Sequence, residues 1–362
     1  MRRVCGFAGS LVAGAGRPRA ALVLLALLAA LSLAGHARSQ PQQASPAASG
    51  PRLEAEAFVS SDGARLPLQQ WGPRAGEPWA VIVGVHGMND DSNAFELAGP
   101  YWARDGILTI AYDQRGFGRS PRHGVWVGDA VLVEDLRTLI SLVRARYPHA
   151  ILAVAGESMG ATIAVEASAN PPTADRIVLL SPALWGWSTQ PAAYKIALRL
   201  AARADPSVKV QPAWVTKHRL PSDNTDQLRH RQSDRYRVIK DMRVDALYAM
   251  VDGMQRASDE LGRIPVPIAY LVGAHDELIP RGALAAAARA LKPSDHSALY
   301  SNGWHLLLID RQRETVFDDI AGFIRDPAAP LASGAPVVPG APTGANAPAP
   351  QAAAALRTPT RR

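Results

Sequence analysis

The sequence predicts an α/β fold in which helices cover both faces of a mostly parallel sheet and a helical cap is inserted late in the chain. One observation is that short apolar segments, typical of strands buried on both faces, alternate with amphipathic helical segments. Another is that this alternation stops from about residue 185 to 263, where the chain has helical patterns, many charges and no clear strand. It then resumes, which is typical of an insertion between two central strands.

The elements before the insertion can be read in order. Residues 52–72 alternate apolar and polar side chains around Asp62-Gly63, which predicts an antiparallel hairpin. Apolar runs rich in small and β-branched residues then predict strands at 79–85, 107–112, 150–155 and 176–180. Helices are predicted at 93–104 and from Asp129, where leucine, isoleucine and valine recur with the spacing of one buried helix face.

The elements within and after the insertion complete the predicted fold. Helices are expected at 191–204 and 243–260 in the cap. Strands at 267–272 and 298–300 and a closing amphipathic helix at 315–324 follow. The folded domain is therefore expected to span residues 52–326, with the cap at about 185–263.

The two ends of the chain are predicted to lie outside that domain. Residues 1–37 contain four arginines and no acid, then an apolar run of 15 residues, then small residues, which is the layout of a secretory signal peptide. The run is shorter than the roughly 20 residues of a membrane-crossing helix. We therefore expect an exported protein, periplasmic or secreted, with an uncleaved inner-membrane anchor as the alternative. Residues 38–51 are interpreted as a linker, and the Pro/Ala-rich residues 327–362 are predicted to be disordered.

The charge of the folded part gives no indication of a nucleic-acid partner. The formal net charge is +7, and the seven arginines of the two ends account for all of it. The domain between them is balanced, so the basic pI near 9.8 is weak evidence for nucleic acid or an acidic partner. The only cysteine, Cys5, lies in the predicted signal peptide, which leaves the mature chain without a disulfide or a thiolate metal site.

A Gly-x-Ser-x-Gly pattern, Gly156-Glu157-Ser158-Met159-Gly160, follows a predicted buried strand and precedes an Ala/Val-rich helical run. In such a strand–turn–helix the serine sits on a strained turn that exposes its hydroxyl. Glycines two residues before and after the serine avoid collisions with the neighbouring strand and helix. Because Gly and Ser are also common in ordinary turns, the pentapeptide alone does not establish a nucleophile.

Two later strand ends supply partners for this serine. A serine hydroxyl needs a base to take its proton, and the base needs an acid to orient it. Asp276 follows the strand at 267–272, and His305 follows the strand at 298–300. Both lie at carboxyl ends of strands, where open α/β sheets bind their ligands, and the order Ser158, Asp276, His305 is the one expected after a nucleophile elbow. We predict that these three residues form a catalytic triad.

Other residues compete for the roles of acid and base. Glu277 is a carboxylate beside Asp276, and His275 and His296 are further histidines. His275 lies on the same loop as the candidate acid, and His296 precedes its strand rather than following it. Both histidines are therefore poorly placed for the role.

The oxyanion of a tetrahedral intermediate needs hydrogen-bond donors. We expect one to be the backbone amide of Met159, directly after the serine, and the other the amide of Met88, in the loop His86-Gly87-Met88 after the strand at 79–85. His86 itself is interpreted as a locally packed residue outside the triad. No metal and no cofactor are expected.

Five motifs together carry a resemblance to a known family. They are His86-Gly87-Met88, Asp113-x-Arg115-Gly116-x-Gly118-x-Ser120, Gly156-x-Ser158-Met159-Gly160, Gly273-x-x-Asp276 and Gly303-Trp304-His305. From about Phe58 to Ile324 the chain resembles an α/β-hydrolase of the monoacylglycerol lipase/lysophospholipase group, the serine aminopeptidase-like branch. The resemblance implies hydrolysis of carboxylic esters, often single-chain glycerides or lysophospholipids, under a cap of variable sequence. It also implies that the loop at 113–120 is mainly architectural, and Glu157 stands where animal monoglyceride lipases have a histidine.

The expected function is therefore that of an exported serine esterase with a lid, acting on a lipid-like or short acyl ester, with peripheral membrane contact through the cap. An aminopeptidase would share the fold and triad but would need an acid to hold the substrate amine. A non-catalytic envelope protein of this fold is disfavoured because no triad member is missing. The acyl length, head group and oligomeric state are left open by the sequence. If the protein were an aminopeptidase, the cap acids that could hold the substrate amine are Asp223, Asp226 and Asp245. The cap residues expected to pack over the site are Trp185, Trp187 and Tyr194.

Overall fold

A nine-stranded sheet forms the centre of the domain in the computed structural model, which describes residues 50–169, 174–211, 219–232 and 239–342. The strand order is β1-β2-β3-β5-β4-β6-β7-β10-β11. Strands β1 to β3 are antiparallel to one another and β3 is antiparallel to β5, whereas all neighbours from β5 to β11 are parallel. This confirms the predicted hairpin and the mostly parallel sheet. The strands are β1 (Arg52–Leu53), β2 (Ala57–Val59), β3 (Arg65–Trp71), β4 (Ala80–Val85), β5 (Ile107–Tyr112), β6 (Ile151–Glu157), β7 (Arg176–Leu180), β10 (Ile268–Gly273) and β11 (His296–Tyr300).

Helices cover both faces of the sheet because successive strand side chains point to opposite sides. In β4, Val81 and Val83 belong to one apolar core, whereas Ala80 and Ile82 belong to the other. The predicted helix at 93–104 is divided into a short 3₁₀ helix and an α-helix. The first core includes α3 (Asp129–Arg146), α4 (Met159–Ser168) and α9 (Arg281–Ala288); the second includes η1 (Ser92–Phe95), α2 (Ala98–Ala103) and α10 (Arg313–Arg325).

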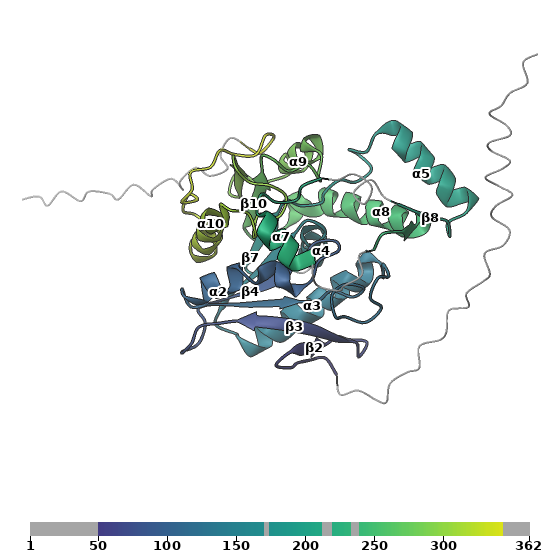
Figure 1. Cartoon of the computed structure of the whole chain (residues 1–362). Helices are drawn as coiled ribbons and strands as arrows, with labels where there is room; N and C mark the ends of the chain where they lie inside the picture. The colour runs from purple at the N-terminus through teal and green to yellow at the C-terminus, as the bar shows by residue number, and fades with distance from the viewer. Residues whose placement is uncertain (1–49, 170–173, 212–218, 233–238, 343–362) are drawn as a thin grey trace, which may run out of the picture. The chain divides into compact units, whose positions relative to one another are not determined.

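The cap lies between β7 and β10 and is mainly helical. Helix α8 packs on α4, and α5 packs on the outer side of α8 (Figure 1). Two short strands, β8 and β9, pair antiparallel within the cap. The sequence did not predict them because two-residue strands have no alternation to detect. The cap elements are α5 (Ala192–Ala204), β8 (Lys209–Val210), α7 (Thr225–Gln232), β9 (Met242–Arg243), α8 (Val244–Glu260) and η2 (Leu261–Arg263).

The segment 327–342 packs on the domain, so the expectation of disorder from residue 327 onward is wrong for these residues. Leu331 and Val338 are buried, with 7% and 2% of their surface exposed. The Leu299 amide, on the edge strand β11, donates to the Pro336 carbonyl oxygen at 2.7 Å. An edge strand leaves unpaired backbone groups, and this Pro-rich segment covers some of them without a periodic pattern of its own.

The remaining parts of both termini, residues 1–49 and 343–362, lie outside the described residues, together with the predicted signal peptide and nearly all of the predicted linker. Within the described residues, no helix has the length and apolar character needed to cross a membrane.

Candidate active site

The turn that carries Ser158 is fixed by close backbone contacts. A Cβ at Gly156 would lie 2.5 Å from the Gly160 carbonyl oxygen, and a Cβ at Gly160 would lie 2.1 Å from the Val85 carbonyl oxygen. Ser158 has φ 55° and ψ −115°, a strained conformation for a residue with a side chain. Its amide donates to the Leu180 carbonyl oxygen at 2.9 Å. The two glycines therefore let α4 start against the sheet, and the neighbouring strands hold the serine in its strained turn.

Asp276 and His305 form a buried hydrogen-bonded pair. His305 Nδ1 lies 2.8 Å from Asp276 Oδ2, and His305 and Asp276 are 2% and 4% exposed. The other carboxylate oxygen, Oδ1, accepts from the amides of Leu278 at 2.8 Å and Ile279 at 3.1 Å. Because the carboxylate accepts at both oxygens, His305 donates through Nδ1, which leaves Nε2 as the ring nitrogen that can take a proton.

Close contact between the loops after β10 and β11 brings this pair together. A Cβ at Gly273 would lie 2.2 Å from the Trp304 carbonyl oxygen, and one at Gly303 would lie 2.9 Å from Gly273 Cα. The His275 amide also donates to the Gly303 carbonyl oxygen at 2.8 Å. Glycine at both positions is thus required for the approach of the two strand ends.

The competing residues have other surroundings. Glu277 and His275 are both exposed. The His275 ring stacks on the Trp304 ring, with 5.3 Å between the ring centroids. His296 begins strand β11, and its Nε2 lies 2.8 Å from the Pro327 carbonyl oxygen. The carboxylate that contacts His305 is that of Asp276.

The loop after β4 is held by His86. The Gln114 amide donates to His86 Nε2 at 3.0 Å, so Nδ1 carries the proton and donates to the Gly87 carbonyl oxygen at 2.8 Å. The Gln114 side chain donates to the His86 carbonyl oxygen at 2.6 Å. His86 is therefore a locally bonded residue, as the sequence indicated. Met88 follows in this loop, and Met159 is the first residue of α4, so its amide has no acceptor within the helix.

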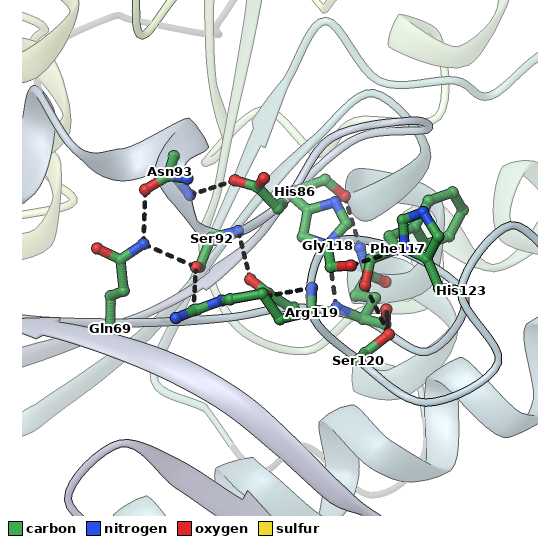
Figure 2. Close-up of polar contacts among 12 residues, drawn as sticks. Gln69, His86, Ser92, Asn93, Phe117, Gly118, Arg119, Ser120 and His123 are labelled. Carbon is green, nitrogen blue, oxygen red and sulfur yellow. Dashed lines mark hydrogen bonds and ion pairs between the residues drawn. The ribbon is translucent and has the colours of Figure 1, made fainter. Parts of the chain in front are cut away.

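The loop at 113–120 supports this region through hydrogen bonds (Figure 2). Asp113 accepts from the Ser92 amide through Oδ1 and from the Arg119 amide through Oδ2, each at 2.9 Å. The Ser120 hydroxyl donates to the Gln114 carbonyl oxygen at 2.7 Å. These contacts connect the 113–120 loop to η1 and, through Gln114, to His86, which agrees with an architectural role.

A cavity of about 1040 Å³ lies between the sheet and the cap. Gly87, Met88, Ser158, Met159 and His305 all line it. The serine, the histidine and the two expected amide donors thus share one space. Ten of the other lining residues are apolar side chains from cap helices α5 and α8 and from the loop after β10: Tyr194, Leu198, Ala201, Val244, Leu247, Met250, Val251, Met254, Leu278 and Ile279. No group of three or more His, Cys, Asp or Glu side chains in the described part of the chain is arranged to hold a metal ion.

The cap residues that the sequence analysis named have different positions. Trp185 and Tyr194 line the cavity. Trp187 instead donates to Asp252 Oδ1 at 2.5 Å and packs on the Tyr248 ring. None of the three candidate amine ligands is among the described lining residues, and each contacts an arginine: Asp223 the Arg311 amide, Asp226 Arg229 and Asp245 Arg243.

Sequence reasoning missed a charged pair that lines the cavity. Asp90, on the loop after β4, pairs with Arg231 from α7, and both residues are among those that line it. Glu157 interacts with both of them and is 1% exposed, and its burial raises the pKa to about 8 from the usual 4.5. No local pattern pointed to Arg231, because Leu228 is the only apolar residue of α7, too few for an amphipathic pattern, and the partner of Arg231 is 141 residues away. For Glu157, the only signal was a carboxylate at the end of an otherwise apolar strand.

Comparisons with known proteins identify relatives of this chain. Residues 76–312 match the model of the family described as serine aminopeptidase, S33. A monoacylglycerol lipase of Mycolicibacterium smegmatis is 26% identical over 74% of this chain and 95% of its own length. The human monoglyceride lipase is 25% identical over 82% of this chain and 99% of its own. The solved monoacylglycerol lipase of Paleococcus ferrophilus superposes with a TM-score of 0.60 at 21% identity, covering 72% of this chain and 99% of that one, which shows a shared fold.

Proposed function

Because the chain belongs to the serine aminopeptidase S33 family and is a serine hydrolase with the α/β-hydrolase fold, we propose that it cleaves carboxylic esters of single-chain lipids. Monoacylglycerols and lysophospholipids are the substrate classes. The observation that carries this proposal is the apolar cavity that Ser158 and His305 both line. Its volume of about 1040 Å³ is at the upper end of small-molecule sites, which suits an acyl chain and a polar head together.

In this mechanism Ser158 Oγ attacks the ester carbonyl while His305 Nε2 takes its proton. Asp276 holds the Nδ1–H tautomer and stabilises the imidazolium that forms. The amides of Met88 and Met159 bind the oxyanion, and one such donor contributes about 3 kcal/mol to transition-state stabilisation. The alcohol leaves with the proton from His305, and water then hydrolyses the acyl-enzyme by the same route.

The acyl chain is accommodated by the cap. Tyr194, Leu198 and Ala201 lie on one face of α5, at positions i, i+4 and i+7, and all three line the cavity. Residues of α8 line it as well. A hydrocarbon chain that lies between these two helices replaces water against apolar side chains, at roughly 0.8 kcal/mol per buried CH₂.

The substitution Ser158→Ala tests the reaction. It should abolish turnover of p-nitrophenyl esters and labelling by a fluorophosphonate probe while the circular dichroism spectrum is unchanged. Ser141→Ala is the matched control, because Ser141 is an exposed serine on α3 whose hydroxyl donates to the Arg137 carbonyl oxygen of its own helix. Wild-type turnover in Ser158→Ala would refute the assignment, and absence of labelling in the wild type would favour a non-catalytic binding protein.

Substrate class is tested with an acyl-length series, a monoglyceride, a lysophospholipid and an amino-acyl arylamide. We expect esters to be preferred over the arylamide, because none of the three cap acids is among the described residues that line the cavity. Asp226 and Asp245 also form ion pairs with arginines, and Asp223 accepts from the Arg311 amide. A higher kcat/KM for the arylamide would instead identify an aminopeptidase.

Peripheral membrane contact through the cap is part of the proposal. Ile196 and Leu200 on α5 are 58% and 59% exposed, and Arg199 and Arg203 of the same helix are exposed as well. An amphipathic helix that exposes apolar and basic residues binds anionic lipid surfaces. Replacing both Ile196 and Leu200 by Asp should abolish sedimentation with phosphatidylglycerol vesicles, whereas the exposed control Val337→Asp should not change it. Equal sedimentation of the double variant and the wild type would refute this contact.

Export completes the proposal. The N-terminal layout supports a cleaved signal peptide. Fractionation with N-terminal sequencing of the mature protein tests it: a new N-terminus near residue 38 is expected, and an intact N-terminus in the membrane fraction would establish the uncleaved anchor.

A further inference from the structure

Glu157, the residue before Ser158, is a buried carboxyl group with one oxygen that has no hydrogen-bond partner among the described residues. It ends strand β6, and the alternation of that strand places its side chain on the same face as Ala153 and Ala155, on the side of the sheet covered by α2 and α10. It is 1% exposed, and its Oε1 has no hydrogen-bond partner among the described residues. A carboxyl group in such a place is stable only when it is neutral or paired.

The groups around Glu157 come from three other segments. Asp90 lies on the loop after β4, Arg231 on cap helix α7, and Asp310 on the loop that carries His305. The two aspartates oppose ionisation of Glu157 and the arginine favours it, but Arg231 is already bonded to Asp90. Asp90 and Asp310 are both close to Glu157, and the nearby guanidinium group of Arg231 already pairs with Asp90. Glu157 therefore has no cation among the described residues that pairs with it alone.

One contact connects Glu157 directly to the loop of the base. The Leu308 amide, three residues after His305, donates a hydrogen bond to the Glu157 carboxyl group; this bond, like Arg231, favours the ionised form, but burial and the two aspartates outweigh both and raise the pKa of Glu157. In the same loop the Trp304 amide donates to Asp310 Oδ2 at 2.6 Å, and the Ser222 hydroxyl donates to Asp310 Oδ1 at 2.6 Å. The segment from 304 to 310 is thus held on both sides of His305.

We propose that Glu157 is a positioning residue that, as a neutral carboxylic acid, joins the serine turn to the loop of His305 and keeps the imidazole in reach of Ser158. Ionised Glu157 places a second uncompensated negative charge beside Asp310 and Asp90. The charge is relieved when the 304–310 loop moves away and water enters, and this movement separates the base from the nucleophile. This inference rests on the proposed function, because it assigns Glu157 a part in the same reaction.

The test is the pH dependence of kcat/KM for a soluble p-nitrophenyl ester. Since burial raises the pKa of Glu157 to about 8, wild-type kcat/KM should fall about tenfold between about pH 7.5 and 9. Glu157→Gln keeps the shape and removes the charge, so it should retain wild-type activity at pH 7 and lose this alkaline decrease. Glu157→Ala lacks the contact with Leu308 and should have a lower kcat at every pH with little change in KM.

Glu166→Gln is the matched control. Glu166 is another mostly buried carboxyl group, on α4, whose pKa burial raises to about 7, but it pairs with Arg256 and lies outside the described cavity lining. This variant should keep the wild-type profile. The same alkaline decrease in wild type and Glu157→Gln, or a normal kcat in Glu157→Ala at pH 7, would overturn the inference while the proposed function stands. Absence of both hydrolysis and Ser158 labelling in the wild type would overturn both.

Discussion

Gly160 lets α4 begin directly against the end of β4, and Gly160→Ala tests whether this close approach sets the position of Ser158. The new Cβ would lie 2.1 Å from the Val85 carbonyl oxygen and 2.6 Å from that of His86. Real Cβ contacts stay above 3.0 Å, so the helix would have to withdraw by about 0.9 Å. The strand cannot move instead, because β4 is paired with β5 on one side and β6 on the other.

The magnitude follows from this displacement. Overpacking at a rigid site costs about 3 kcal/mol of the free energy of unfolding. A shift of about 1 Å in a reacting group costs about 100-fold in rate, and Ser158 and Met159 both move with the start of α4. We therefore expect Gly160→Ala to lose about 3 kcal/mol in stability and about 100-fold in kcat/KM.

Urea unfolding and ester turnover measure the two quantities separately. Gly322→Ala on α10 is the matched control, since an added Cβ there meets no atom within 4 Å and the glycine is exposed in a helix. This control should gain about 0.5–1 kcal/mol with unchanged turnover. Wild-type stability and turnover in Gly160→Ala would show that the sheet and helix can separate at no cost, and the explanation of the second glycine would be wrong.

Three further predictions concern the acid, the C-terminal segment and the buried glutamate. Asp276→Asn should lower kcat about 10³- to 10⁴-fold with an unchanged fold, because the amide favours the wrong tautomer of His305. Burst kinetics would detect the lower kcat, and a normal kcat would exclude Asp276 as the acid. Leu331→Ala should cost about 2 kcal/mol in urea unfolding, whereas the exposed Val337→Ala should cost less than about 0.5 kcal/mol; equal effects would mean that the segment does not contribute to the core. For Glu157 the folded pKa is raised from 4.5 to about 8, so its contribution is fully present below the unfolded pKa and is lost as pH rises through the folded one. Relative to Glu157→Gln, wild type should lose about 1.4 kcal/mol of stability per pH unit between about pH 5.5 and 7.5, and parallel curves would contradict the burial argument.

Much of the fold could be predicted from local pattern because the relevant physics is local. Strands buried on both faces need continuous apolar runs, and helices on a sheet need one apolar face, so β4, β5, β6 and α3 were each readable from a short window. The positions of Ser158, Asp276 and His305 could be predicted because each lies in the segment that follows the carboxyl end of a strand, and parallel strands end at the same edge of the sheet.

The C-terminal segment and the short cap strands could not be predicted in this way. The apolar residues of 327–342 follow no helical or strand periodicity, and this segment is held in place by its contact with the edge strand β11. Strands β8 and β9 consist of two residues each and exist because the fold of the cap brings them together.

The sequence by itself determined the class of fold, the serine turn and the order of the candidate catalytic residues, because steric requirements on strands, helices and glycines act between neighbours in the chain. Only the tertiary structure decided which carboxylate contacts His305, which cap residues line the cavity, and that Glu157 lies among Asp90, Arg231 and Asp310. The burial and the charged neighbours of these residues depend on segments that lie far apart in the chain; Glu157 and Asp310, for example, come from strand β6 and from the loop that carries His305. The loss of water around Glu157, which raises its pKa, arises only when those segments are assembled.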